Sequence, residues 1–210
     1  MDLVDLYLSE YDYDPIKRQQ SKIQYQSKKF SHHIYHSIPY AVTFNSDGYD
    51  DEDGHGQHML QITWLLNDEK DIKKFTPVMD LALYLLDYML IGTSSAPLYK
   101  RLTESGLGSN IIGYGLNPGL LQQTFAVGMK NVKKNDIATL ETLILQILRD
   151  VARDGFSYEE IEAGLNSIEF QLREGQHSES NPAGVSVFLQ LLTKWNYDLD
   201  PESAIDFEVS

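Results

Sequence analysis

The stretch "SNIIGYGLNPGLLQQTFAVGMK", residues 109–130, decides the fold. Two apolar runs flank Asn117-Pro118-Gly119, a tripeptide typical of a tight turn. In the second run, larger side chains at positions 125, 127 and 129 alternate with smaller ones at 124, 126 and 128. This period of two predicts a β-hairpin that turns one face toward a core.

Helical patterns lie on both sides of the hairpin. Between residues 75 and 90 apolar residues recur at spacings of four and three, which predicts a buried helix that starts at Pro77 and ends before Gly92. A short helix over residues 97–104 leads into Gly106 and Gly108, and we expect left-handed backbone at both glycines.

Three further helices follow the hairpin. We expect Asn135 to cap the first and Gly155 to end it, Ser157 and Glu160 to form a capping box on the second, and Asn181-Pro182 to open the third. Upstream, residues 34–44 and 58–66 are rich in apolar and β-branched residues and predict strands, joined by an acidic, glycine-rich loop at 45–57.

This order predicts an α+β domain in which helices pack on one face of an antiparallel sheet. Residues 1–30 are polar and are interpreted as an arm that connects to a preceding domain, and residues 31–210 as one α+β domain.

Composition removes several classes of function. The 210 residues include no cysteine, which excludes disulfides, thiolate metal sites and cysteine nucleophiles. The formal charge of −14 disfavours nucleic acid as a partner, because phosphate binding needs a basic face. No membrane association is expected, because the longest apolar stretch, Pro77 to Ile91, is interrupted by two aspartates.

Two patterns resemble metal sites. His32 and His36 have the spacing of a zinc-binding pair, but no glutamate base accompanies them and their segment is expected to be extended, which would separate them. The acidic loop 45–57 lacks the alternating oxygen ligands of a calcium loop, because Tyr49 stands in the third place counted from Asp47. A solvated loop is the favoured interpretation.

Three other patterns have structural explanations. The glycines at 106, 108, 113 and 115 lack the lysine of a phosphate loop. Ser94 and Ser95 lack a nucleophile elbow. Glu159 and Glu160 suit the first turn of a helix, where negative charge is favourable. None of these residues forms a catalytic constellation.

One segment is far more specific than its composition. "SSAPLYKRLTESGLGS", Ser94 to Ser109, resembles the S-P-x-Y-K-x-L-x-E-S-G-L-G pattern of the presequence-protease and falcilysin group in the pitrilysin/insulinase family of zinc metallopeptidases. Ala96 replaces the usual serine. The matching residues are Pro97, Tyr99, Lys100, Leu102, Glu104, Ser105, Gly106, Leu107 and Gly108.

Two further segments match in the same order. "GFSYEEIEAGLNSIEFQLRE" is similar to a family helix with I-E-A-x-L-x-x-I-E-x-Q, and "WNYDLDP" is similar to W-x-x-D-x-D-P through Trp195, Asp198, Asp200 and Pro201. The resemblance spans residues 62–201.

The resemblance implies the second, non-catalytic domain of such an enzyme, with a processing-peptidase-like fold that this chain leaves C-terminally truncated. In the family, an inverted H-x-x-E-H motif and a downstream glutamate bind zinc in the first domain. No such motif occurs here, so no catalytic, cofactor-binding or metal-binding residue is assigned, and the 210-residue chain alone is expected to be inactive.

The implied partners are the other domains of the same polypeptide and, for the whole enzyme, unfolded peptides degraded in a closed chamber. The compartment stays open among mitochondrion, plastid, vacuole and cytosol. Two alternatives also stay open: a scaffold or assembly domain of the same fold, and a peptide-binding module.

Overall fold

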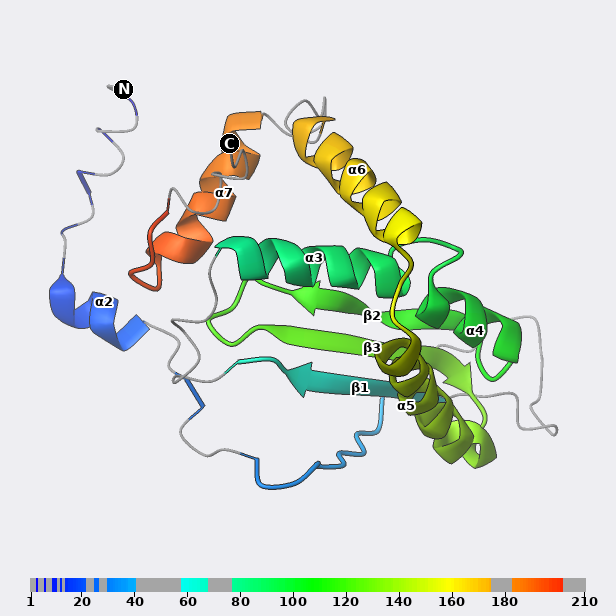
Figure 1. Ribbon diagram of the computed structural model, residues 1–210. Coiled ribbons are helices and arrows are strands. Elements are labelled where there is room, and N and C mark those ends of the chain that lie inside the picture. The colour runs from blue at the N-terminus through cyan, green and yellow to red at the C-terminus, as the bar shows by residue number, and fades with distance from the viewer. Residues whose placement is uncertain are drawn as a thin grey trace.

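The computed structural model describes residues 14–21, 30–40, 58–67, 77–174 and 183–201, together with residues 3, 6, 9, 10, 12, 25 and 26. Figure 1 shows how its elements are arranged. In chain order they are α2 (Pro15–Ser21), β1 (His58–Leu65), α3 (Pro77–Ile91), α4 (Pro97–Ser105), β2 (Asn110–Asn117), β3 (Thr124–Val132), the 3-10 turn η2 (Lys134–Asp136), α5 (Ile137–Asp154), α6 (Tyr158–Glu174) and α7 (Ala183–Trp195).

The sheet has three antiparallel strands in the order β1-β3-β2, so β3 is central. Phe125 of β3 pairs with Trp64 of β1 on one side and with Leu116 of β2 on the other. The register between β2 and β3 shifts between Ile112 and Gly115, which marks a β-bulge. The predicted hairpin is therefore confirmed, with a bulge that the sequence pattern did not indicate.

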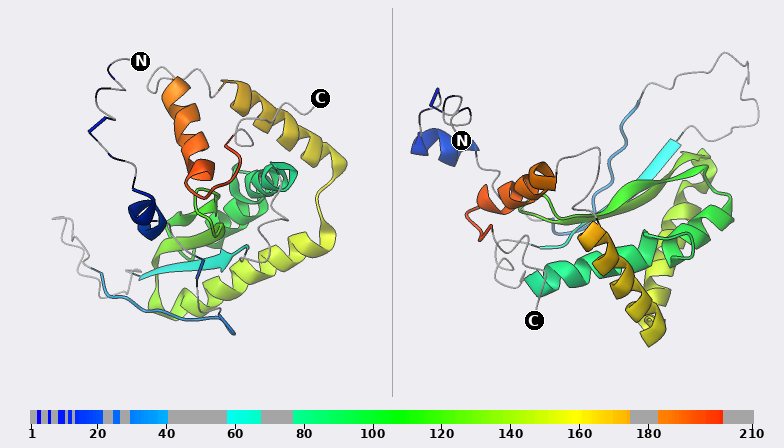
Figure 2. Two further views of the ribbon diagram at one scale, coloured as in Figure 1. Left: turned by 90° about the vertical axis from the view of Figure 1, so that its left-hand side faces the viewer. Right: turned by 90° about the horizontal axis from the view of Figure 1, so that it is seen from above.

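Helices cover one face of this sheet, as Figure 2 shows. Along β1 the side chains of Leu60, Ile62 and Trp64 are partly buried, while those of the residues between them are exposed. The partly buried residues face α5, which contacts both β1 and β3, and α3 and α4 contact β2. The expected α+β architecture is confirmed.

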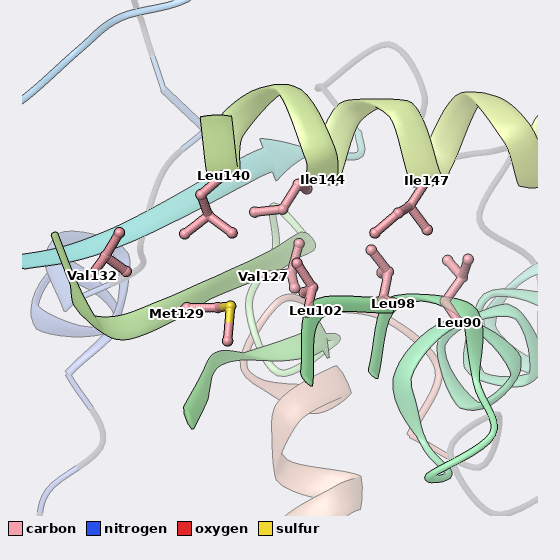
Figure 3. Packing of buried hydrophobic residues seen from close by; sticks show 9 residues of the cluster. All are labelled: Leu90, Leu98, Leu102, Val127, Met129, Val132, Leu140, Ile144 and Ile147. Atoms are coloured by element: carbon pink, nitrogen blue, oxygen red, sulfur yellow. The ribbon is translucent and has the colours of Figure 1, made fainter. Parts of the chain in front are cut away.

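The core lies between β3 and helices α4 and α5 (Figure 3). Val127 and Met129 project from β3 toward Leu98 and Leu102 of α4 and toward the apolar face of α5. The fully buried members of this cluster are Leu98, Leu102, Val127, Met129, Val132, Leu140, Ile144 and Ile147. Burying one such side chain stabilises a fold by about 1.5–3 kcal/mol, so this cluster contributes substantially to the stability of the domain.

Helix α6 packs against α3. A Cβ placed on Gly164 of α6 would lie 2.9 Å from Cδ1 of Leu85 on α3, so the absence of a side chain there lets the two helices approach closely. The predicted capping box starts α6: the Ser157 N–H donates to the Glu160 carboxylate at 2.7 Å, and the Glu160 N–H donates to Ser157 Oγ at 3.2 Å. Within the described residues, no helix is both long enough and apolar enough to cross a bilayer.

The strand predicted at 34–44 is wrong over its described part. Residues 34–40 form no strand, and no backbone ladder connects the described residues of this segment to β1. Its larger side chains stay exposed, with Tyr35 at 70% and Ile38 at 79%, and Pro39 has no N–H to donate. Tyr35 joins it to the core layer by donating from its hydroxyl to Glu141 Oε1 of α5 at 2.8 Å. Residues 41–44 lie outside the described residues.

The cap predicted at Asn135 is also wrong. The Asp136 N–H donates to the Lys133 carbonyl at 2.9 Å, so a 3-10 turn precedes α5 and Asn135 lies inside it. The capping position falls to Asp136, whose side chain makes no capping hydrogen bond. Gly155 ends α5 as expected, with a φ of 71° and its N–H donated to the Val151 carbonyl.

A partly buried carboxyl joins α3 to the β2 bulge. Asp87 Oδ1 accepts the Leu116 N–H at 2.8 Å, and Gly115 next to it has a φ of 62°. A Cβ on Gly115 would collide with Asp87 Oδ1, so a glycine is required on both grounds. Burial raises the pKa of the Asp87 carboxyl above its ordinary value, and the hydrogen bond from Leu116 opposes this by favouring the charged form.

A carboxyl whose pKa is higher in the folded than in the unfolded chain makes folding less favourable above its folded pKa. That penalty disappears below the unfolded pKa, which for aspartate is about 3.9. Asp87→Asn keeps an acceptor for Leu116 and removes the charge, so we expect the free energy of unfolding at pH 7 to rise. Urea denaturation as a function of pH measures it, and the gain over the unmodified chain should shrink as the pH falls toward 4. Glu162→Gln, which removes one exposed charge from α6, is the control; a gain that does not change with pH would contradict the assignment.

Candidate functional site

The first family-like segment forms α4 and the turn that follows it. Leu98 and Leu102 are spaced one helical turn apart, and both are fully buried against the core. Ala96 precedes the helix and is 4% exposed. Pro97 stands at the first helical position, where its missing N–H has no helical partner to lose. These residues fix α4 to the sheet.

Ser105 and Gly106 end helix α4. Ser105 Oγ donates to the Leu102 carbonyl at 2.7 Å and accepts the Leu107 N–H at 3.2 Å. Gly106 takes the left-handed conformation with a φ of 65°, as expected for a helix end. The side chain and the backbone together turn the chain from α4 toward β2.

Gly108 serves a different purpose from the one predicted. Its φ is not positive, so the expected left-handed backbone is absent there. A Cβ at this position would lie 2.8 Å from the Lys130 carbonyl oxygen and 3.0 Å from Met129 Cβ. The glycine is required because the chain passes directly against β3.

The remaining motif residues of α4 face outward. Tyr99 is 41% exposed, and Lys100 and Glu104 are exposed as well. Between them, Arg101 donates from Nη1 to Asp150 Oδ2 of α5 at 2.7 Å. Tyr99, Lys100 and Glu104 therefore take no part in the buried core.

The third family-like segment, Trp195 to Pro201, caps α7. The Leu199 N–H donates to the Lys194 carbonyl at 3.1 Å, and the Asp198 N–H donates to the Trp195 carbonyl at 3.1 Å. These two bonds, with Asp198 in the left-handed region at a φ of 57°, make a Schellman motif. Asp200 follows the cap in an exposed position, and Pro201 follows it.

The cap also meets α2, from the other end of the described chain. Asp198 Oδ1 accepts a hydrogen bond from Arg18 Nη2 at 2.6 Å, with side chains 53% and 42% exposed. A pair this exposed stabilises little, because water screens it. Its importance is geometric, since it joins segments 180 residues apart in the sequence.

A polar network that the sequence patterns did not indicate lies beside this cap. Lys194 Nζ donates to Asp80 Oδ2 at 2.6 Å, and Gln123 Nε2 donates to Asp80 Oδ1 at 3.0 Å. The Gln123 N–H donates to Asn67 Oδ1 at 2.7 Å, and Asn67 Nδ2 donates to the Leu121 carbonyl at 2.9 Å. Four segments, carrying residues 67, 80, 121–123 and 194, meet here, so no local pattern could have revealed the network.

A small pocket opens next to the network, with a cavity volume of about 50 Å³. Gln123 is 5% exposed, and its Oε1 has no hydrogen-bond partner among the described residues. A buried acceptor left unsatisfied costs about 1–3 kcal/mol. The residues that line the pocket are Asn67, Pro118, Leu120, Leu121, Gln123, Thr193, Lys194, Tyr197 and Leu199.

The other sequence candidates do not converge. His32 and His36 lie in a segment that forms no helix, so they do not share a helix face, and His32 Nδ1 is hydrogen-bonded to Ser31 Oγ at 2.9 Å. Ser95 meets Thr93 in the loop before α4. The acidic loop 45–57 lies outside the described residues. In the part of the chain that the structure describes, no three histidine, aspartate or glutamate side chains are grouped so that they could hold a metal ion.

The cap on α7 gives a direct test of its geometry. Asp198→Ala and Asp198→Gly both remove the carboxylate that meets Arg18, but only alanine keeps a Cβ in left-handed backbone. We expect the alanine variant to be less stable than the glycine variant by about 1 kcal/mol in urea denaturation. Equal stabilities would show that residue 198 does not adopt the left-handed conformation in solution.

Comparison with known proteins places these segments in a family. The family model described as "Peptidase M16 inactive domain" matches residues 1–168. The chain is 43% identical over 145 residues to Presequence protease 1, chloroplastic/mitochondrial, of Arabidopsis thaliana, which covers 69% of this chain and 13% of that protein. It is 29% identical over 202 residues to Protein HypA of Clostridium perfringens, which covers 96% of this chain and 19% of that protein.

A solved structure has the same fold. The inactive peptidase domain of a predicted zinc protease from Bordetella parapertussis aligns with a TM-score of 0.52 at 17% identity, covering 71% of this chain and 79% of that one. The chain spans 13% and 19% of the lengths of the two curated relatives above. The resemblance found in the sequence is thereby confirmed, and the chain belongs to the peptidase M16 inactive domain family.

Proposed function

We propose that this chain is a non-catalytic domain of a large zinc metalloendopeptidase, in which it forms part of the wall of a closed chamber and packs against the zinc-binding domain. The family is described as an inactive domain, and a relative that shares 43% of aligned residues is named a presequence protease. Zinc would be bound by a preceding domain of the same polypeptide. The substrates of the whole enzyme would be unfolded peptides.

The observation that carries this proposal is the uncovered apolar surface of the last two helices. On α6, Phe170 is 64% exposed, and on α7 Phe188 and Leu189 are 51% and 56% exposed. No α7 side chain that the structure describes is buried. Large apolar side chains that stay exposed on these two helices favour a surface that packs against a partner.

Another domain of the same polypeptide is the partner that fits best. The relatives are much longer than this chain, which covers 13% of the Arabidopsis protein, so they contain additional sequence that could bury these helices. In this arrangement residues 1–30 serve as the connection from the preceding domain and residues 31–210 as one folded unit. The relative's printed name supports a mitochondrial or plastid location.

A scaffold role for the same fold is the alternative. The two hypotheses differ in one feature of the full-length protein. The peptidase requires an H-x-x-E-H motif in the domain before this one, and the scaffold does not. The coding sequence upstream of residue 1 therefore separates the two: the motif supports the peptidase, and its absence supports the scaffold.

The purified 210-residue chain should neither retain zinc nor cleave peptides. After dialysis, metal analysis is expected to find far less than one zinc per chain, and a quenched-fluorescent peptide should stay intact. The physical reason is the absence of grouped ligands among the described residues. Cleavage by the chain that a chelator abolishes would refute the non-catalytic assignment.

The packing role predicts a difference between the chain and the whole enzyme. Phe170→Ser with Phe188→Ser should change the free energy of unfolding of the chain by less than about 0.5 kcal/mol per site, because both side chains are exposed. In the full-length protein each should weaken the domain contact by about 1–3 kcal/mol and lower peptide turnover.

Asn166→Ser, an exposed polar change on α6, is the matched control and should leave turnover unchanged. Full turnover and unchanged thermal stability of the full-length double variant would argue against burial of this surface.

A further inference from the structure

One side of helix α6 packs against α3. Ile161, Gly164, Ile168 and Leu172 recur at spacings of three and four residues, so they share this side of the helix. Each of them is buried or partly buried, and Gly164 allows a close contact with Leu85 of α3. The other large apolar side chains of α6 lie outside this packed side and are exposed.

A second side of α6 carries a stripe of exposed residues. Tyr158, Glu162, Leu165 and Glu169 follow one another at spacings of four, three and four residues, so they also share one side of the helix. All four residues of this α6 stripe are exposed, Tyr158 at 77% and Leu165 at 43%. Phe170, the residue after Glu169, is exposed as well. Apolar side chains two helical turns apart in water favour a surface that another helix covers.

The charge on α6 is mostly negative, because the helix carries five glutamates and one arginine. Glu159 and Glu160 lie in the first turn, where the helix dipole favours a negative charge. Glu162 lies beyond the first turn, and among the described residues it forms no ion pair. Glu169 pairs with Arg173, the single arginine of the helix. The helix dipole therefore does not account for the two carboxylates of the α6 stripe.

We propose that the α6 stripe receives a basic helix of a neighbouring domain of the same polypeptide. Apolar residues of that helix would cover Tyr158 and Leu165, and its lysine or arginine side chains would pair with Glu162 and Glu169. The charges select this partner, because an acidic face would be repelled and an apolar face would leave the carboxylates unpaired at the contact. The stripe is about 16 Å long, which a helix of three turns matches. The inference rests on the proposed function, which supplies the neighbouring domain.

Titration of the 210-residue chain with two synthetic helical peptides, followed by ¹⁵N–¹H NMR, tests the charge of the partner. The peptides share one apolar stripe of leucines, which is flanked by lysines in the first peptide and by glutamates in the second. We expect the lysine peptide to give saturable shifts at the amides of the α6 stripe, with a Kd of roughly 0.1 mM. The glutamate peptide should bind at least about tenfold more weakly, since two ion pairs become two repulsions. Equal affinities, or shifts scattered over the chain and not gathered on α6, would overturn the proposal.

Variants separate the α6 stripe from the overall negative charge of the chain. Glu162→Lys should weaken binding of the lysine peptide by about fivefold and strengthen binding of the glutamate peptide. Glu104→Lys makes the same charge change at an exposed position of α4 and is the matched control, which should leave both affinities nearly unchanged. Leu165→Gln should weaken both peptides, because it removes apolar contact. Equal effects of Glu162→Lys and Glu104→Lys would refute the assignment to α6.

The full-length protein distinguishes this inference from the proposed function. Glu162→Lys should lower its melting temperature in calorimetry more than Glu104→Lys does, while the two variants of the 210-residue chain should melt alike. If Phe170→Ser with Phe188→Ser weakens the domain contact and Glu162→Lys does not, the packing role stands and the basic partner is refuted. A raised KM for a basic peptide substrate at an unchanged melting temperature would identify a free peptide as the occupant and would also overturn the proposal.

Discussion

The contact between the inner face of β3 and helices α4 and α5 is the interaction on which the rest of the structure depends. Val127 and Met129 of β3 meet Leu98 and Leu102 of α4 and the Leu140, Ile144 and Ile147 stripe of α5, all at 1% exposure or less. Strands β1 and β2 both pair with β3, and α3 contacts both α4 and β2. The turn at Ser105–Gly108 connects α4 to β2. Gly108 packs closely against β3, which fixes the position of this turn.

The parts of the fold that local physics determines could be predicted from the sequence. The period-two alternation at 124–129, the three-and-four spacing at 75–90 and the Ser157–Glu160 capping box each depend on residues close together in the chain. The predictions for Asn135 and for the described residues 34–40 were wrong because contacts beyond the local sequence determine the backbone at these positions. A strand at 34–40 would have to pair with an edge strand of the sheet, and the described residues of this segment form no such ladder. The turn at Lys134–Asp136 places Asn135 inside a 3-10 turn.

In the candidate site, too, some features depend on residues close together in the sequence and others on residues far apart. Gly106, Leu98 and Leu102 have roles that follow from helix geometry, whereas the Asn67–Gln123–Asp80–Lys194 network depends on four segments that meet only after folding. The motif residues of α4 and its turn have different structural roles. Leu102 and Gly108 shape the core layer, while Tyr99, Lys100 and Glu104 point into water and do not.

The attachment of α7 has a consequence for how stability is distributed along the chain. α5 is held by fully buried side chains, whereas α7 is held at its C-terminal end by the Lys194–Asp80 pair and by the Asp198–Arg18 pair just beyond it, and its described side chains are only partly buried or exposed. Regions with few buried apolar contacts open with a smaller free energy than the global unfolding. α7 can therefore separate from the sheet while the β3–α4–α5 layer stays folded, so that its hydrogen-exchange protection reports a local opening and that of α5 reports the unfolding of the whole domain.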